Sequence, residues 1–158
     1  MARNRAPLIE TGTGRVEDLN HEGWGVVRAG KTVFVAGALP GETVEYRIRR
    51  RERSHDEAEL LQVIEASPQR VTPGCEHFGI CGGCSLQHLA PEAQRGVKDN
   101  MLREALRRIG KVEPETWLPP LHGDAWAYRR RARLGARFVH AKGRSLVGFR
   151  EKMSSYVA

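Results

Sequence analysis

The sequence predicts a mainly β protein with some α structure: a small N-terminal barrel, a loop that holds the cysteines, one amphipathic helix and a final β-rich segment. Apolar and polar residues alternate over short runs between residues 8 and 65, as in half-buried strands. An apolar repeat at every fourth residue follows between residues 91 and 109. Aromatic residues are only 6% of the 158 residues and charged residues are 28%, so a small barrel with appendages fits better than one large enzyme fold.

Residues 8–65 contain five short runs with the period of β-strands. Val33 and Val35 alternate with their neighbours after a hairpin turn at residues 29–31, and a second turn at residues 40–41 precedes the alternating run 43–48. The last run, EAELLQVIE at residues 57–65, has a composition that suits a helix, but its place after four strands favours a fifth strand. Five strands in about sixty residues suggest an OB-like barrel, which closes on itself and leaves no free edge.

Breaks rich in proline and glycine divide the rest of the chain. Ser67-Pro68 and Thr72-Pro73-Gly74 interrupt the strand pattern. We therefore expect a barrel domain at residues 1–66, a cysteine loop at residues 67–90, and a helix followed by a β segment at residues 91–158.

The helix is expected over residues 91–109, where apolar side chains form one stripe that should be core, and Gly110 stands where a C-terminal glycine cap would. After a proline-rich connection, residues 128–149 return to strand-like alternation, with a turn at residues 141–143. No further helix or strand follows to cover these strands before Ala158. We therefore expect an incomplete central or catalytic region.

The positive charge of the chain predicts a polyanionic partner. The formal net charge is +7, with 26 Lys and Arg against 19 Asp and Glu. Arginine is well suited to RNA binding because its guanidinium group forms bidentate hydrogen bonds with phosphate and stacks on bases. Two runs concentrate it, and the candidate RNA-binding residues are Arg47, Arg49, Arg50, Arg51 and Arg53 in the first run and Arg129, Arg130, Arg131 and Arg133 in the second.

On a regular strand, Arg47, Arg49, Arg51 and Arg53 would share one face at a spacing of roughly 6.6 Å. The alternative interpretation of this row is a solvated edge that discourages strand-to-strand aggregation. Trp24, between two glycines, is a candidate stacking platform for a base, or else a buried tryptophan of the barrel.

The chain shows no sign of a membrane or secretory destination. No stretch approaches the ~18 apolar residues of a membrane span, and the start MARNRAPLIE lacks the apolar core of a signal peptide. We therefore expect a cytoplasmic protein with no membrane partner. In a reducing cytoplasm, closely spaced cysteines are better metal ligands than disulfide partners.

All three cysteines, Cys75, Cys81 and Cys84, lie within ten positions. Gly82 and Gly83 between the last two allow the backbone to turn both thiolates toward one centre. Three thiolates are one ligand short, and two completions fit. His88 would give a Cys3His zinc site, which the spacing alone favours, whereas a distant fourth cysteine would give a 4Fe-4S cluster.

The segment WGVVRAGKTVFVAGALPGE, residues 24–42, resembles the TRAM domain, an OB-like RNA-binding barrel. Together with CEHFGICGGCSLQHL, the amphipathic helix and WAYRRRARLG, it closely resembles the N-terminal part of bacterial 23S rRNA uracil-C5-methyltransferases, from about Thr11 to Tyr156. The resemblance implies that Cys75, Cys81 and Cys84 bind a 4Fe-4S cluster, whose fourth ligand is expected beyond Ala158, after the strand pair that LVGFREK resembles. His88 is then an ordinary residue before the helix.

The resemblance also implies the function. The chain would be the RNA-binding and iron–sulfur part of an S-adenosylmethionine-dependent enzyme, a monomer when complete, that methylates carbon 5 of a uracil in large-subunit ribosomal RNA. S-adenosylmethionine would bind in a catalytic domain that this chain lacks, because no G-x-G-x-x-G turn occurs and all three cysteines are committed to the cluster. No catalytic residue is therefore predicted here, and some of Arg129–Arg133 would pair with acids of the missing domain. The alternative is a free-standing RNA-binding module with a Cys3His zinc site.

Overall fold

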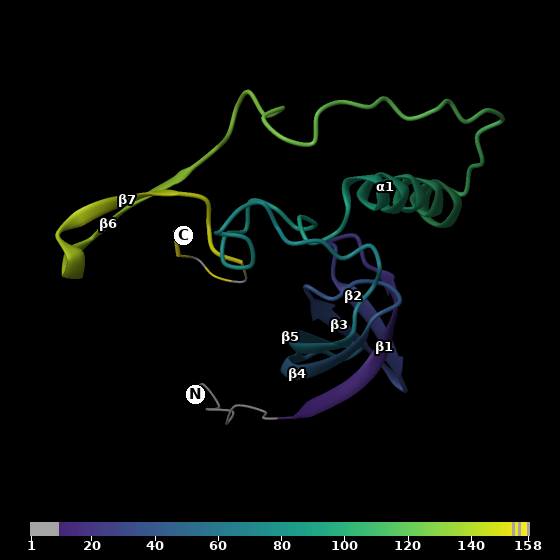
Figure 1. Cartoon of the computed structure of the whole chain (residues 1–158), viewed down its shortest axis with the longest axis horizontal. Helices are drawn as coiled ribbons and strands as arrows, with labels where there is room; N and C mark the ends of the chain where they lie inside the picture. The colour runs from purple at the N-terminus through teal and green to yellow at the C-terminus, as the bar shows by residue number, and fades with distance from the viewer. Residues whose placement is uncertain (1–9, 153, 155, 158) are drawn as a thin grey trace. The chain divides into compact units, whose positions relative to one another are not determined.

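The structure is a computed structural model that describes residues 10–152, 154 and 156–157. The chain forms two compact units, Met1–Val71 and Thr72–Ala158 (Figure 1). The finer division that the sequence predicts, at residues 66 and 90, stays a prediction.

The first unit is a closed five-stranded barrel, which confirms the predicted fold class. Its strands follow the order β1-β2-β3-β5-β4, and β4 pairs antiparallel with β1 to close it. The residues of EAELLQVIE belong to the fifth strand, which runs parallel to β3. The bounds are β1 Thr11–Leu19, β2 Gly25–Ala29, β3 Lys31–Ala36, β4 Thr43–Arg51 and β5 His55–Glu65.

The barrel interior is filled mainly by valines at alternate strand positions. Burying one such side chain contributes about 1.5–3 kcal/mol. Glycines in β1 make room for them: a Cβ at Gly14 would lie 2.5 Å from Val27, and one at Gly12 would lie 2.8 Å from the Tyr46 ring. The buried cluster consists of Val16, Val27, Val33, Val35, Ala38, Val44, Tyr46, Ile48 and Ala58.

A buried carboxylate fastens the segment after β5 to the loop between β3 and β4. Glu42, fully buried, accepts hydrogen bonds from the backbone N–H groups of Leu39 (2.9 Å) and Ser67 (3.2 Å). The Arg70 guanidinium donates to both of its oxygens, at 2.5 and 2.7 Å. Burial alone would raise the pKa of Glu42, but the hydrogen bonds from Arg70, Leu39 and Ser67 outweigh it, so this pKa lies below its ordinary value.

The described part of the second unit contains one α-helix and a two-stranded sheet. Helix α1 spans Pro91–Ala105 and continues as a π-helical turn, Leu106–Gly110, while β6 (Gly135–Val139) pairs antiparallel with β7 (Arg144–Gly148). The predicted turn before β7 is a short 3-10 helix, His140–Lys142. Among the described residues no helix has the length and apolar character needed to cross a membrane.

Three predictions for this unit were wrong. No residue of α1 is buried, and Leu102 and Ile109 are 53% and 84% exposed. Periodicity in the sequence determines which residues share a face of the helix. Burial of that face also requires a second apolar surface packed against it, and none of the described residues provides one. The left-handed residue that ends the helical segment is Lys111 (φ 52°) in place of Gly110.

The third error concerns the predicted strand at residues 128–134, which has no regular structure. Strand β6 starts at Gly135, opposite Gly148 at the end of β7. Beyond this pair the chain leaves the hairpin and pairs with the cysteine loop, at the bridge between Glu151 and Cys81. Among the residues that the structure describes, no strand therefore pairs with residues 128–134 to form a ladder.

Candidate functional site

The arginines of β4 are held by carboxylates of the neighbouring strand. Arg47 lies opposite Glu59 in the β4–β5 register and donates from Nε at 2.6 Å. Arg49 contacts the other oxygen of Glu59 at 3.4 Å. One carboxylate therefore serves two of the arginines that the sequence singled out.

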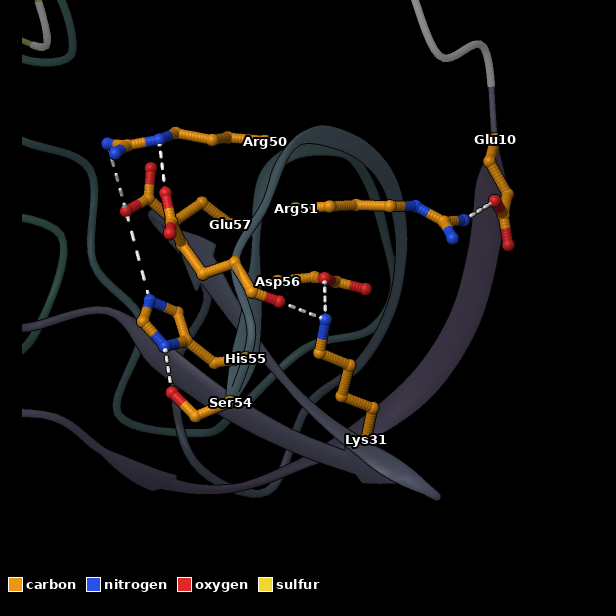
Figure 2. Close-up of polar contacts among 9 residues, drawn as sticks. Glu10, Lys31, Arg50, Arg51, Ser54, His55, Asp56 and Glu57 are labelled. Carbon is orange, nitrogen blue, oxygen red and sulfur yellow. Dashed lines mark hydrogen bonds and ion pairs between the residues drawn. The ribbon is translucent and has the colours of Figure 1, made fainter.

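An irregularity in β4 breaks the predicted row. The register shifts between Ile48 and Arg50, so that Arg50 lies opposite Glu57 and Arg51 opposite Asp56. Arg50 forms an ion pair with Glu52 at 2.6 Å. It forms another with Glu57 at 3.8 Å (Figure 2). The prediction that four alternate arginines share one strand face was therefore wrong.

The end of the row is also different from the prediction. Arg51 is the last residue of β4 and forms an ion pair with Glu10 (Figure 2). Arg53 lies after the strand and has no ion-pair partner among the described residues. It is the one member of this run whose charge no described carboxylate compensates.

The same pattern continues around the β4–β5 hairpin (Figure 2). Lys31 donates to Asp56 at 2.6 Å and to the Glu52 carbonyl at 2.5 Å, and His55 Nε2 lies 3.9 Å from Glu57. Exposed ion pairs contribute only about 0–1 kcal/mol each to stability. Their larger consequence is for binding, because a phosphate must compete with a carboxylate already in place.

Charge is distributed unequally between the two units. Met1–Val71 contains eleven Lys and Arg and eleven Asp and Glu, so its formal charge is zero. Thr72–Ala158 contains fifteen Lys and Arg against eight Asp and Glu. The whole net charge of +7 therefore belongs to the second unit.

The second arginine run is exposed. Arg129, Arg130, Arg131 and Arg133 make no ion pair within the part of the chain that the structure describes. Sequence reasoning missed two similar residues, Arg137 on β6 and Arg144 on β7, which are also exposed. A signal for them was present: residues 125–158 contain nine Lys and Arg and a single acidic residue, Glu151.

Trp24 lies in the turn before β2 and is half-buried. The backbone N–H of Trp24 donates to Asn20 Oδ1 at 2.9 Å, and the backbone carbonyl of Trp24 accepts from the backbone N–H of Asn20 at 2.9 Å. Trp24 is thus neither fully buried in the core nor fully exposed for stacking on a base, and its role in stacking stays a prediction.

The cysteine loop pairs with the segment that follows β7. The Gly82 N–H donates to the Arg150 carbonyl at 2.7 Å, and the Lys152 N–H donates to the Ile80 carbonyl at 2.7 Å. A Cβ at Gly82 would lie 2.8 Å from that Arg150 oxygen, so this close approach requires glycine. Cys75 and Cys81 are half-buried, and Cys84 is exposed.

The surroundings of the thiols are suited to negative charge. The Gly83 N–H donates to Cys81 Sγ at 3.4 Å, and the Lys152 ammonium lies 4.5 Å from the centre of the Phe78 ring. Burial lowers the pKa of Lys152, while the nearby thiols of Cys84 and Cys81 act in the opposite direction. Within the described part of the chain, His, Cys, Asp and Glu side chains do not come together in threes as a metal site.

His88, the alternative fourth ligand, is 2% exposed. Its ring packs against Phe78, with 5.2 Å between the ring centres. The structure therefore gives His88 a packing contact next to the cysteine loop.

Comparison with known proteins identifies relatives of both units. Residues 13–69 match the family described as tRNA (uracil(54)-C(5))-methyltransferase, TRAM domain. Curated relatives named 23S rRNA (uracil(1939)-C(5))-methyltransferase RlmD match nearly the whole chain. The protein of Nitrosococcus oceani is 54% identical over 98% of this chain and 35% of its own length. Those of Alcanivorax borkumensis and Azoarcus sp. are 49% and 52% identical, over 100% and 92% of this chain and 36% and 34% of their own lengths.

The chain therefore spans about a third of the length of these relatives, and it resembles their N-terminal part. The resemblance that the sequence indicated is confirmed, including the TRAM barrel.

Proposed function

We propose that this chain is the RNA-binding N-terminal part of a methyltransferase that modifies carbon 5 of a uracil in 23S ribosomal RNA. The observation that carries the proposal is the similarity of about half of all residues to proteins with that printed activity, over 98% of the chain for one of them. The TRAM match over residues 13–69 supports the RNA-binding role. Such an enzyme acts in the cytoplasm as a monomer, and its S-adenosylmethionine site and catalytic groups belong to the remainder of the protein.

The candidate RNA-binding arginines fall into two groups, those without a carboxylate partner and those already in ion pairs. The four arginines of residues 129–133 and Arg53 have no carboxylate partner among the described residues, so they contact phosphates directly. The arginines of β4 contribute less to RNA affinity, because each must first give up an ion pair before it can contact a phosphate. Their carboxylate partners are Glu59, Glu57, Glu52 and Glu10. Trp24 adds a partly exposed ring beside the barrel for a base.

The cysteine loop fits an iron–sulfur centre by the chemistry of its donors. Three thiols lie within ten residues, and an N–H group donates to the sulfur of Cys81. The Lys152 ammonium offsets thiolate charge near Cys81 and Cys84. In this proposal Cys75, Cys81 and Cys84 hold a 4Fe-4S cluster together with a fourth ligand from outside the chain. Bound there, the cluster would link the three cysteines of the loop through its iron atoms.

Binding of ribosomal RNA tests the proposal. Fluorescence anisotropy with a labelled fragment of 23S rRNA should give binding by the 158-residue chain that weakens steeply with salt. Replacing Arg129, Arg130, Arg131 and Arg133 together by Ala should reduce the salt slope by about 2.8–3.6, at roughly 0.7–0.9 per lost phosphate contact. A chain that binds no RNA at low salt, although folded, would contradict the proposed function.

A further inference from the structure

The β6–β7 hairpin has two chemically different faces. Side chains alternate between the faces of a strand, and residues opposite each other in the register share a face. Arg137 lies opposite Leu146, and Arg144 lies opposite Val139, so both arginines are on the same face. The other face carries Phe138 and Val147, which are 51% and 63% exposed. One face therefore combines both arginines with Val139 and Leu146, and the other carries no charged side chain and is mainly apolar.

The two arginines are diagonal neighbours across the strand pair. Arg137 faces Leu146, two residues from Arg144, and such diagonal positions lie about 7–8 Å apart. Two long guanidinium side chains at this separation can reach successive phosphates of one nucleic acid strand. Both side chains are exposed.

Their charge is uncompensated, in contrast to that of the barrel arginines. Neither Arg137 nor Arg144 forms an ion pair within the described residues. The acidic residues nearest to the hairpin in sequence are Asp124 and Glu151. On β4, by comparison, Arg47, Arg49, Arg50 and Arg51 all have carboxylate partners. A phosphate at the hairpin would meet two available cations and displace no carboxylate.

We propose that the Arg137–Arg144 face of the hairpin is a phosphate-binding surface for RNA. The inference rests on the proposed RNA-binding function and assigns part of it to residues outside both arginine runs. The surface adds to the exposed arginines of residues 129–133, which precede β6 directly in the chain. The apolar face, with Phe138 and Val147, takes no part in contacting phosphate.

The test compares two double variants of the full 158-residue chain that remove the same charge from the same unit. One is Arg137→Ala with Arg144→Ala. The matched control is Arg107→Ala with Arg108→Ala, whose guanidinium groups both pair with Glu104. Binding of a fluorescein-labelled single-stranded RNA oligonucleotide is measured across a salt series. The hairpin variant should bind about 10-fold more weakly at low salt, with a salt slope lower by about 1.4, and the control should change less than about 2-fold.

Two further variants separate phosphate binding from folding and from the other face. Arg137→Lys with Arg144→Lys keeps the charge and should retain most of the affinity, whereas Val147→Ser alters only the apolar face and should leave the salt slope unchanged. Equal losses in the hairpin variant and the matched control would overturn the inference, as would a loss in Val147→Ser as large as in the alanine pair. If the wild-type chain binds RNA and the hairpin variant binds equally well, only this inference fails; if the wild-type chain binds no RNA, the proposed function fails.

Discussion

The barrel and the second unit use their residues in opposite ways. Every buried apolar residue among those described, except Leu89, belongs to the barrel. The second unit instead exposes many of its large apolar side chains, including Leu118 and Leu121 at 81% and 102%. The barrel also balances its charge, whereas the second unit carries all of the net +7.

The barrel buries most of its apolar residues and pairs most of its β4 arginines within itself. The second unit leaves apolar and cationic side chains exposed, where a partner can contact them. In the barrel, Arg47, Arg49, Arg50 and Arg51 already have carboxylate partners, so a polyanion finds fewer free cations there than on the second unit. Exposed apolar and cationic groups are suited to contacts with other surfaces and with polyanions. The predictions below test this contrast in order of decreasing effect.

The largest effect is expected at the cysteine loop of the second unit. The full-length protein, purified without oxygen, should contain iron and sulfide and absorb broadly near ~400 nm. Cys81→Ser should abolish this absorption, because it removes one of the thiolates. His88→Ala should leave the iron content unaltered, since its ring packs against Phe78. One equivalent of zinc that is lost in His88→Ala would instead favour the Cys3His alternative.

In the barrel, Glu42→Ala should lower the free energy of unfolding by about 3–5 kcal/mol, because it leaves the Arg70 guanidinium and two backbone N–H groups without their acceptor. Urea unfolding followed by circular dichroism measures this. Glu22→Ala, an exposed position, serves as the control and should change stability by less than about 0.5 kcal/mol. Equal effects at the two positions would refute the role of the buried carboxylate.

A paired substitution compares apolar burial in the two units. Leu39→Ala removes a fully buried side chain and should cost about 2–5 kcal/mol. Ile109→Ala removes a side chain that is 84% exposed and should cost less than about 0.5 kcal/mol. Thermal unfolding of both variants provides the measurement. A large loss for Ile109→Ala would mean that the π-helical turn after α1 is packed in solution.

Acid should weaken the barrel through Glu42. Its pKa is lowered in the folded state, so its contribution is complete above the unfolded value and is lost as the pH falls through the folded pKa. Urea midpoints of the wild type should therefore fall on acidification below the ordinary carboxylate range, whereas Glu42→Gln should show a flatter profile. Parallel profiles would show that other carboxylates govern acid unfolding.

The smallest effect is expected for the barrel arginines. Replacing Arg47, Arg49, Arg51 and Arg53 by Ala should lower the salt slope of RNA binding by less than the roughly 0.7–0.9 per residue of an unpaired arginine, since three of the four already have carboxylate partners. Unchanged affinity and slope in the folded variant would make this run a solvated edge only.

The sequence was sufficient for the barrel because its pattern is local. Period-two alternation around Val33 and Val35, and a turn before Thr43, determine where strands begin and which side faces inward. The register shift after Ile48 left no such signal, because a strand irregularity depends on the partner strand. The arginine row failed for that reason.

The second unit was harder to predict because its structure depends on contacts that periodicity does not encode. The apolar stripe of α1 correctly indicated a helix, but burial is a property of two surfaces. The strand-like alternation of residues 128–134 likewise had no partner strand. For the cysteine loop, the sequence supplied the thiols and the glycines, while the pairing of Gly82 with Arg150 appears only in three dimensions.

The bridge between Cys81 and Glu151 also fixes an order of events during synthesis. Its two sides are seventy residues apart in the chain, whereas the barrel is built entirely from residues that precede the cysteines. At about 5–20 residues per second, a ribosome needs about 4–14 seconds to proceed from one side of the bridge to the other. During that interval the barrel can close, while the cysteine loop still lacks the segment around Glu151 that pairs with it. The interval in which the loop exists without its partner segment is therefore set by the rate of translation.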